Sequence, residues 1–138
     1  MEQYNSPPLS TIACRRHRRV MVIDDDIAYA RARGIRLSMM GHAVHVETSG
    51  IAAVIAAETY RPEVVLLDIA MPGMSGFGVA SRLRRAAWGQ SIVLAAMTDS
   101  AEPLLCRRLI DFRFDACLPR AASDDELRSV LGIERNVG

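Results

Sequence analysis

Short runs of consecutive apolar residues recur along the chain, and each run stops at a polar residue. Such runs, rich in Val, Ile and Leu, are typical of strands that are buried on both faces. Two weaker segments, 42–47 and 116–118, favour shorter strands. The three strongest runs occupy residues 20–23, 64–67 and 92–97, and the polar residues that end them are Asp24, Asp68 and Thr98.

The segments between these runs have the spacing of amphipathic helices. Ile27, Ala30, Gly34 and Leu37 share one face of the first helix. We expect helices over residues 27–40, 50–60, 76–87, 103–111 and 123–131. Strand and helix therefore alternate along the chain, which predicts an α/β fold. Its expected form is a doubly wound, five-stranded parallel sheet with right-handed crossovers, a (βα)5 flavodoxin-like arrangement.

The composition suits one globular domain. The chain has 138 residues, of which 50% are hydrophobic and 24% are charged. The formal net charge of +1 gives no reason to expect nucleic acid or an anionic membrane as a partner. The three cysteines, without metal-ligand spacing, indicate reduced thiols in a cytoplasmic protein. We expect a flexible extension over residues 1–17, one domain over 18–132 and a tail over 133–138.

The polar residues at the strand ends predict a site for phosphate chemistry. The carboxyl ends of parallel strands meet at one edge of a sheet, so Asp24, Asp25, Asp68 and Thr98 should converge there. Carboxylates held close together repel one another, and a hard divalent cation such as Mg²⁺ neutralises them. An ionised Asp beside Mg²⁺ can attack phosphorus and form an aspartyl phosphate.

Several motifs, in the same order and at similar spacing, resemble those of bacterial response-regulator receiver domains. Residues 20–26 (VMVIDDD) resemble the first-strand signature of that family, and residues 65–76 (VLLDIAMPGMSG) resemble its phosphoacceptor segment. Residues 114–118 (FDACL) resemble the approach to its last strand. Thr98 and Arg120 follow Asp68 at the spacing of the family's hydroxyl and basic residues.

The resemblance implies a role for each matching residue. Asp68 is the phosphoacceptor, and Thr98 and Arg120 assist the transfer. The implied Mg²⁺ ligands are Asp24, Asp25, Asp68 and the carbonyl of Ala70. The phosphoryl donor is a histidine kinase or a phosphotransfer protein, and the output goes through a protein partner. We expect no nucleic-acid or membrane partner, we leave homodimerisation open, and we expect a domain that assists its own phosphorylation rather than an enzyme with a separate substrate.

Four positions depart from the family pattern. Arg120 replaces a Lys, Ala121 replaces a Pro, Asp99 stands where a small residue is usual, and Cys117 replaces an aromatic residue or His. Arg keeps the positive charge but is longer, planar and forked. Asp99 either caps the following helix, or pairs with Arg120, or repels the phosphoryl group. Arg120 itself either serves the site or is a solvated surface residue.

The leading hypothesis is a stand-alone receiver or the excised receiver of a longer protein. The main alternative is a pseudo-receiver, a protein-interaction module that no longer depends on phosphorylation. A third is an unrelated Mg²⁺-dependent phosphotransferase. We also expect Cys117 in the core, His42 and His45 at the surface or a sheet edge, and a solvated basic leader formed by Arg15, Arg16, Arg18 and Arg19.

Overall fold

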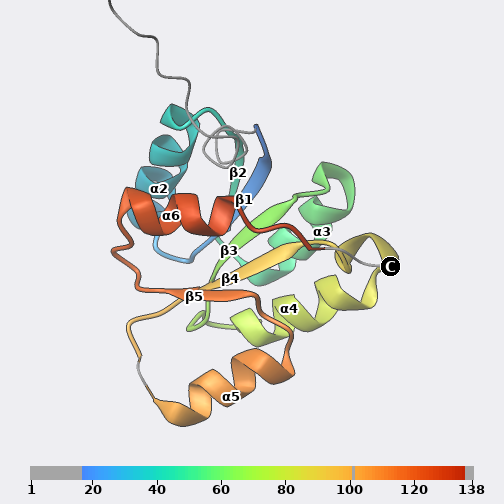
Figure 1. Cartoon of the computed structure of the whole chain (residues 1–138). Helices are drawn as coiled ribbons and strands as arrows, with labels where there is room; N and C mark the ends of the chain where they lie inside the picture. Colours follow the sequence, from blue (N-terminus) through green and yellow to red (C-terminus); the bar gives the residue numbers. More distant parts are fainter. Residues whose placement is uncertain (1–16, 101, 136–138) are drawn as a thin grey trace, which may run out of the picture.

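The computed structural model describes residues 17–100 and 102–135. Its centre is a five-stranded parallel sheet with the strand order β2-β1-β3-β4-β5 (Figure 1). This order confirms the doubly wound α/β fold. The strands are β1 (Arg19–Ile23), β2 (Ala43–Glu47), β3 (Val64–Asp68), β4 (Val93–Met97) and β5 (Ala116–Leu118).

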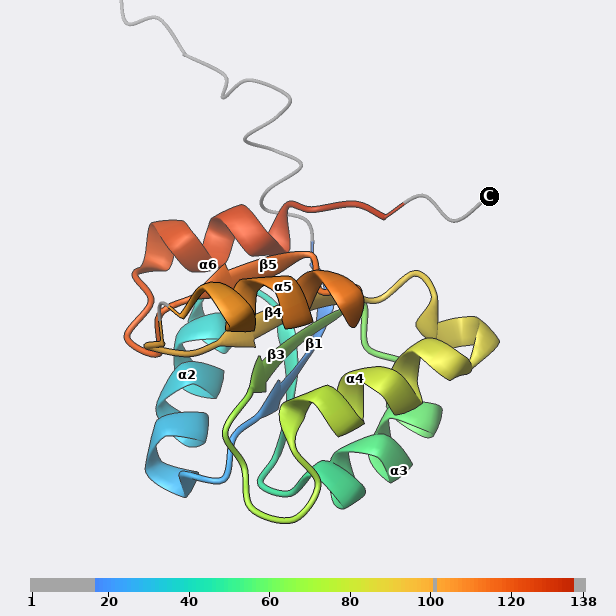
Figure 2. The same ribbon diagram turned by 90° about the horizontal axis from the view of Figure 1, so that it is seen from below.

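Helices cover both faces of the sheet (Figure 2). Alternate residues of a strand point to opposite faces, so Val20 and Val22 pack towards α2 and α6 whereas Met21 and Ile23 pack towards α3 and α4. The helical elements are α2 (Ile27–Met39), α3 (Gly50–Tyr60), α4 (Gly76–Arg85), a 3₁₀ turn η1 (Ala87–Gly89), α5 (Pro103–Asp111) and α6 (Asp124–Leu131).

The buried stripe of α2 differs from the expected one. Ala30, Gly34 and Leu37 are buried as predicted, but Ile27, in the first turn of the helix, is 54% exposed. Arg33 takes part in the buried stripe, with 3% exposure. A charged residue on the core face of a helix requires a partner, and Arg33 therefore points to the polar site described below.

Three expectations about side-chain exposure are wrong, although β2, which contains His45 and directly follows His42, is an edge strand as expected. His42 is buried, and its Nδ1 accepts the Arg18 N–H at 3.1 Å; burial lowers the pKa of His42, which suits a neutral acceptor. Arg18 is buried too, because its Nη1 donates to the carbonyls of Leu131 and Ile133. Cys117 is exposed, since β5 is a three-residue strand at the edge of the sheet. Cys14, Arg15 and Arg16 lie outside the described residues.

A buried arginine closes the end of α4. The prediction extended this helix to residue 87, but it ends at Arg85 and η1 follows. Arg84 is 1% exposed, and its Nη1 donates to the carbonyls of Gly89 at 2.9 Å and Ile92 at 2.6 Å. Its Nη2 donates to the Arg113 carbonyl at 2.8 Å and to Asp115 at 3.1 Å. One guanidinium thus joins α4 to the starts of β4 and β5.

Replacing Arg84 should destabilise the fold strongly. In Arg84→Met, buried carbonyls lose their donor and Asp115 loses one of its donors, so we expect the free energy of unfolding to fall by about 3 kcal/mol. Urea denaturation measures the change. Arg85→Met is the matched control, because Arg85 is the exposed neighbour on the same helix, and it should stay within about 0.5 kcal/mol of the parent. Equal losses in both variants would refute the structural role of Arg84.

Candidate functional site

Three carboxylates meet at the carboxyl edge of the sheet. The register pairs Ile23 of β1 with Leu67 of β3, so the next residues, Asp24 and Asp68, are brought together. Oxygen atoms of Asp24, Asp25 and Asp68 all lie within 4.8 Å of one another. Asp24 is fully buried and Asp68 is 3% exposed, whereas Asp25 is exposed. The predicted convergence of these residues is present.

Asp24 is surrounded by donors. Its Oδ1 accepts the N–H of Asp26 at 2.9 Å. The Nη2 of Arg120 lies 3.1 Å from Oδ1 and 3.0 Å from Oδ2 of Asp24. The Nη1 of Arg33 lies 3.4 Å from Oδ2. Two guanidinium groups therefore share the negative charge of one buried carboxylate.

Arg33 also holds the loop that carries Arg120. Its Nη2 donates to the Arg120 carbonyl at 2.7 Å. The guanidinium carbon of Arg33 lies 5.1 Å from the centre of the Tyr29 ring, and that of Arg120 lies 4.6 Å from it. Cations over an aromatic face are attracted to it. The start of α2 and the loop after β5 are thus tied together across Asp24.

Asp99 contributes to the same loop. Its carboxylate accepts the backbone N–H of Arg120 at 3.0 Å. Asp99 is therefore not the cap of the following helix: α5 begins at Pro103, and its N-cap residue is Glu102. Of the two alternatives for Arg120, the structure agrees with a place in the site and not with a solvated surface residue, because its side chain contacts Asp24. Partial burial lowers the pKa of Arg120, but Asp24 and Asp68 outweigh that effect and raise it.

The environment of Asp68 favours its neutral form. Burial, the neighbouring charge of Asp24 and a hydrogen bond with Asp25 raise the pKa of Asp68 to about 6. The N–H of Ala70, which donates to Asp68 Oδ1 at 3.2 Å, and the charge of Arg120 act in the opposite direction. Repulsion between the charges of the neighbouring carboxylates contributes to the raised pKa of Asp68, and a bound cation would relieve that repulsion.

Thr98 lies one residue beyond the strand partner of Asp68. The register pairs Asp68 with Met97, so Thr98 directly follows that pair at the edge of the sheet. Its N–H donates to the Leu118 carbonyl at 2.9 Å, and its Oγ1 accepts the Ser100 N–H at 3.1 Å. Because Oγ1 uses a lone pair in that bond, its hydroxyl hydrogen can still be donated.

The donor set fits Mg²⁺. Hard divalent cations prefer carboxylate and carbonyl oxygens, and the clustered oxygens of Asp24, Asp25 and Asp68 supply that chemistry. Ala70 lies on the exposed loop directly after Asp68. Arg120, with 30% of its side chain exposed, adjoins the cluster from the solvent side.

Sequence reasoning did not find Arg33. The available signal was its helical spacing: Arg33 lies three residues after Ala30 and four before Leu37, both on the core-facing stripe. A charge at such a position indicates a buried ion pair.

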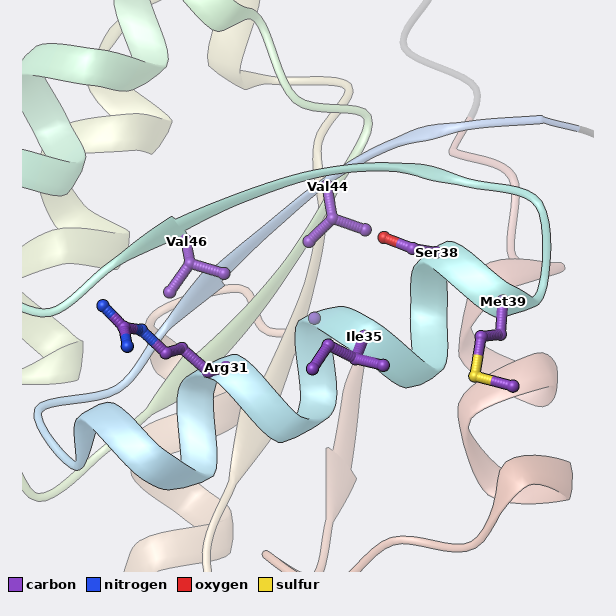
Figure 3. Close-up of a pocket in the computed structure, with 7 residues that line it drawn as sticks. Arg31, Ile35, Ser38, Met39, Val44 and Val46 are labelled. Atoms are coloured by element: carbon purple, nitrogen blue, oxygen red, sulfur yellow. The ribbon is translucent and has the colours of Figure 1, made fainter.

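A second hollow lies away from this edge. An apolar groove of about 560 Å³ is lined by residues of α2 and of the edge strand β2 (Figure 3). Ile35 and Met39 line it from the helix, and Val44 and Val46 line it from the strand. Among the described residues, Arg31 is the charged residue of its lining, and no carboxylate lines the groove. It therefore offers none of the chemistry of the acidic site.

Comparisons with known proteins agree on one family. The family model of the response regulator receiver domain matches residues 20–132. The transcriptional regulatory protein KdpE of Mycobacterium tuberculosis is 41% identical over 83 residues, which are 60% of this chain and 37% of that protein. The DNA-binding response regulator MtrA of the same species is 36% identical over 87 residues, 63% of this chain and 38% of MtrA. The chain spans little more than a third of the length of these relatives.

Solved structures share the fold. The chemotaxis protein CheY4 of Vibrio cholerae superposes with a TM-score of 0.79 at 21% identity, covering 84% of this chain and 97% of that one. The receiver domain of the sensor histidine kinase PA1611 of Pseudomonas aeruginosa, with magnesium coordinated in its active-site cleft, has a TM-score of 0.76 at 21% identity, covering 84% and 95%. In residues 17–100 and 102–135, no helix is long and apolar enough to cross a membrane. The chain belongs to the response regulator receiver domain family.

Proposed function

We propose that this domain accepts a phosphoryl group on Asp68 in a Mg²⁺-dependent reaction. The donor is a histidine kinase or a histidine phosphotransfer protein, and the phosphorylated domain signals through a protein partner. The observation that carries the proposal is the gathering of Asp24, Asp25 and Asp68 at one edge of the sheet, in a chain of the receiver family.

In this reaction a carboxylate oxygen of Asp68 attacks the phosphorus atom. The bond from phosphorus to the donor nitrogen breaks, and the nitrogen retains the electron pair and takes up a proton from solvent. Asp24, Asp25, Asp68 and the carbonyl of Ala70 would hold Mg²⁺. Mg²⁺, when bound, neutralises the carboxylates and the developing charge on the phosphoryl oxygens.

Thr98 and Arg120 donate to the phosphoryl oxygens. Arg120 is suited to this role because its Nε has no hydrogen-bond partner among the described residues. Its Nη2 contacts Asp24, and we expect the planar fork, which matches phosphate geometry, to move from Asp24 to a phosphoryl group on Asp68. The Lys-to-Arg departure from the family pattern thus leaves a cation in place.

The relatives KdpE and MtrA are named as transcriptional and DNA-binding regulators. The chain spans only part of their length, so a DNA-binding function is not assigned to the described domain. We propose that one protein partner donates the phosphoryl group to this domain and that a second protein partner receives its output.

The second candidate function is a protein-interaction module that does not depend on phosphorylation. The contacts of Asp24 with both Arg33 and Arg120 favour it, because the buried charge has counter-ions without any metal. The two candidates differ in whether Asp68 accepts a phosphoryl group.

Intact mass spectrometry separates them. After incubation with Mg²⁺ and a small donor such as phosphoramidate, we expect one phosphoryl adduct on the parent protein and none on Asp68→Asn, because the acceptor oxygen is lost. EDTA should abolish the adduct. Absence of an adduct with phosphoramidate and with a phosphorylated histidine kinase, on folded protein, would leave the interaction module as the function.

The raised pKa of Asp68 predicts a pH-dependent stability. The folded state holds a proton on Asp68 up to about pH 6, whereas the unfolded chain loses it near pH 4. Stability from this group is therefore highest below about pH 4 and declines as the pH rises to about 6. In EDTA at about pH 8, Asp68→Asn should raise the free energy of unfolding by roughly 2 kcal/mol, and below about pH 4 the difference should vanish.

Urea denaturation at the two pH values measures this effect. Asp111→Asn is the control, because Asp111 is exposed at the end of α5, and its effect should stay within about 0.5 kcal/mol at both pH values. A less stable Asp68→Asn at the higher pH would contradict the electrostatic description of the site.

A further inference from the structure

We propose that Arg33 is a permanent internal counter-ion of the acidic site and that it sets how tightly the site binds Mg²⁺. The inference rests on the proposed function, because it concerns the metal affinity of the same carboxylates. Arg33 is a positioning residue: it contacts Asp24 and the Arg120 carbonyl rather than a reacting group.

Arg33 and Arg120 differ in their freedom to leave Asp24. The side chain of Arg120 is 30% exposed and extends from the loop after β5, so it can turn away when a cation or a phosphoryl group arrives. The side chain of Arg33 is 3% exposed and extends from the core-facing stripe of α2. Its two terminal nitrogens contact Asp24 and the Arg120 carbonyl. Its charge therefore stays beside Asp24.

A fixed charge at this place acts in two directions. Without metal, Arg33 compensates the buried Asp24 and so stabilises the site. When a metal ion approaches, the positive charge of Arg33 repels it, because both cations lie beside the same carboxylate, that of Asp24. The domain thus tolerates low Mg²⁺ without losing its fold, and it requires more Mg²⁺ before it can be phosphorylated.

The test measures the Mg²⁺ dissociation constant by isothermal titration calorimetry. Arg33→Met removes the charge and keeps a similar apolar stem, and Mg²⁺ should bind on the order of tenfold more tightly than to the parent. Arg31→Met is the matched control: it removes the same charge from an exposed position of the same helix, and its affinity should change less than about twofold.

A gain of affinity distinguishes this role from a structural one, since damage to the site would weaken binding. If Arg33→Met does not fold in EDTA, Arg33→Gln, which keeps a donor for the Arg120 carbonyl, should show the same gain. The rise of the melting temperature on adding Mg²⁺ should also be larger in the Arg33 variants than in the parent.

The outcomes separate this inference from the proposed function. Tighter binding in the Arg33 variants supports the inference, even if the parent binds too weakly to measure. Unchanged or weaker binding in those variants, with a parent that binds Mg²⁺ and gains a phosphoryl group, overturns the counter-ion role alone. If neither the parent nor any variant binds Mg²⁺ and Asp68 gains no phosphoryl group, the proposed function and the inference both fail.

Discussion

The buried charge of Asp24 is the constraint on which the site depends. A carboxylate that is shielded from water requires hydrogen-bond donors or cations around it. The partners of Asp24 are the Asp26 N–H, Arg33 and Arg120. These partners come from the N-cap residue of α2, from α2 itself and from the loop after β5. Satisfying one charge thereby joins the first helix to a loop that lies near the other end of the chain, beside the carboxylates of Asp25 and Asp68.

The sheet topology supplies the rest of the arrangement. β1 and β3 are neighbours, and so are β3 and β4. Asp24, Asp68 and Thr98 therefore lie at the carboxyl ends of adjacent strands, although up to 74 residues separate them in the sequence. At the opposite end of the sheet, Arg84 joins α4 to the starts of β4 and β5. A buried arginine thus connects a helix to strand ends at each end of the sheet: Arg33 beside the site and Arg84 away from it.

The sequence predicted the features that depend on the periodicity of apolar residues and on the residues that end each strand. The fold and the convergence of Asp24, Asp25 and Asp68 follow from apolar runs that stop at acidic residues. The partners of Arg33 and Asp99 and the exposure of Cys117 could not be predicted in this way. Arg33 lies on a stripe that is normally apolar, Asp99 binds a backbone amide 21 residues away, and Cys117 is exposed on a three-residue strand at the edge of the sheet. Helical spacing alone places Arg33 on the buried stripe of α2, but its partners, the partner of Asp99 and the exposure of Cys117 depend on tertiary contacts that local patterns do not encode.

A structure of the domain with Mg²⁺ and beryllofluoride, a phosphoryl mimic, on Asp68 tests the role of the buried Asp24 most directly. We expect the cation to contact Asp24, Asp25 and Asp68, Arg120 to move from Asp24 to the mimic, and Arg33 to stay on Asp24. A structure in which Arg120 remains on Asp24 and no cation binds, or in which Arg33 leaves Asp24, would contradict this role of Asp24.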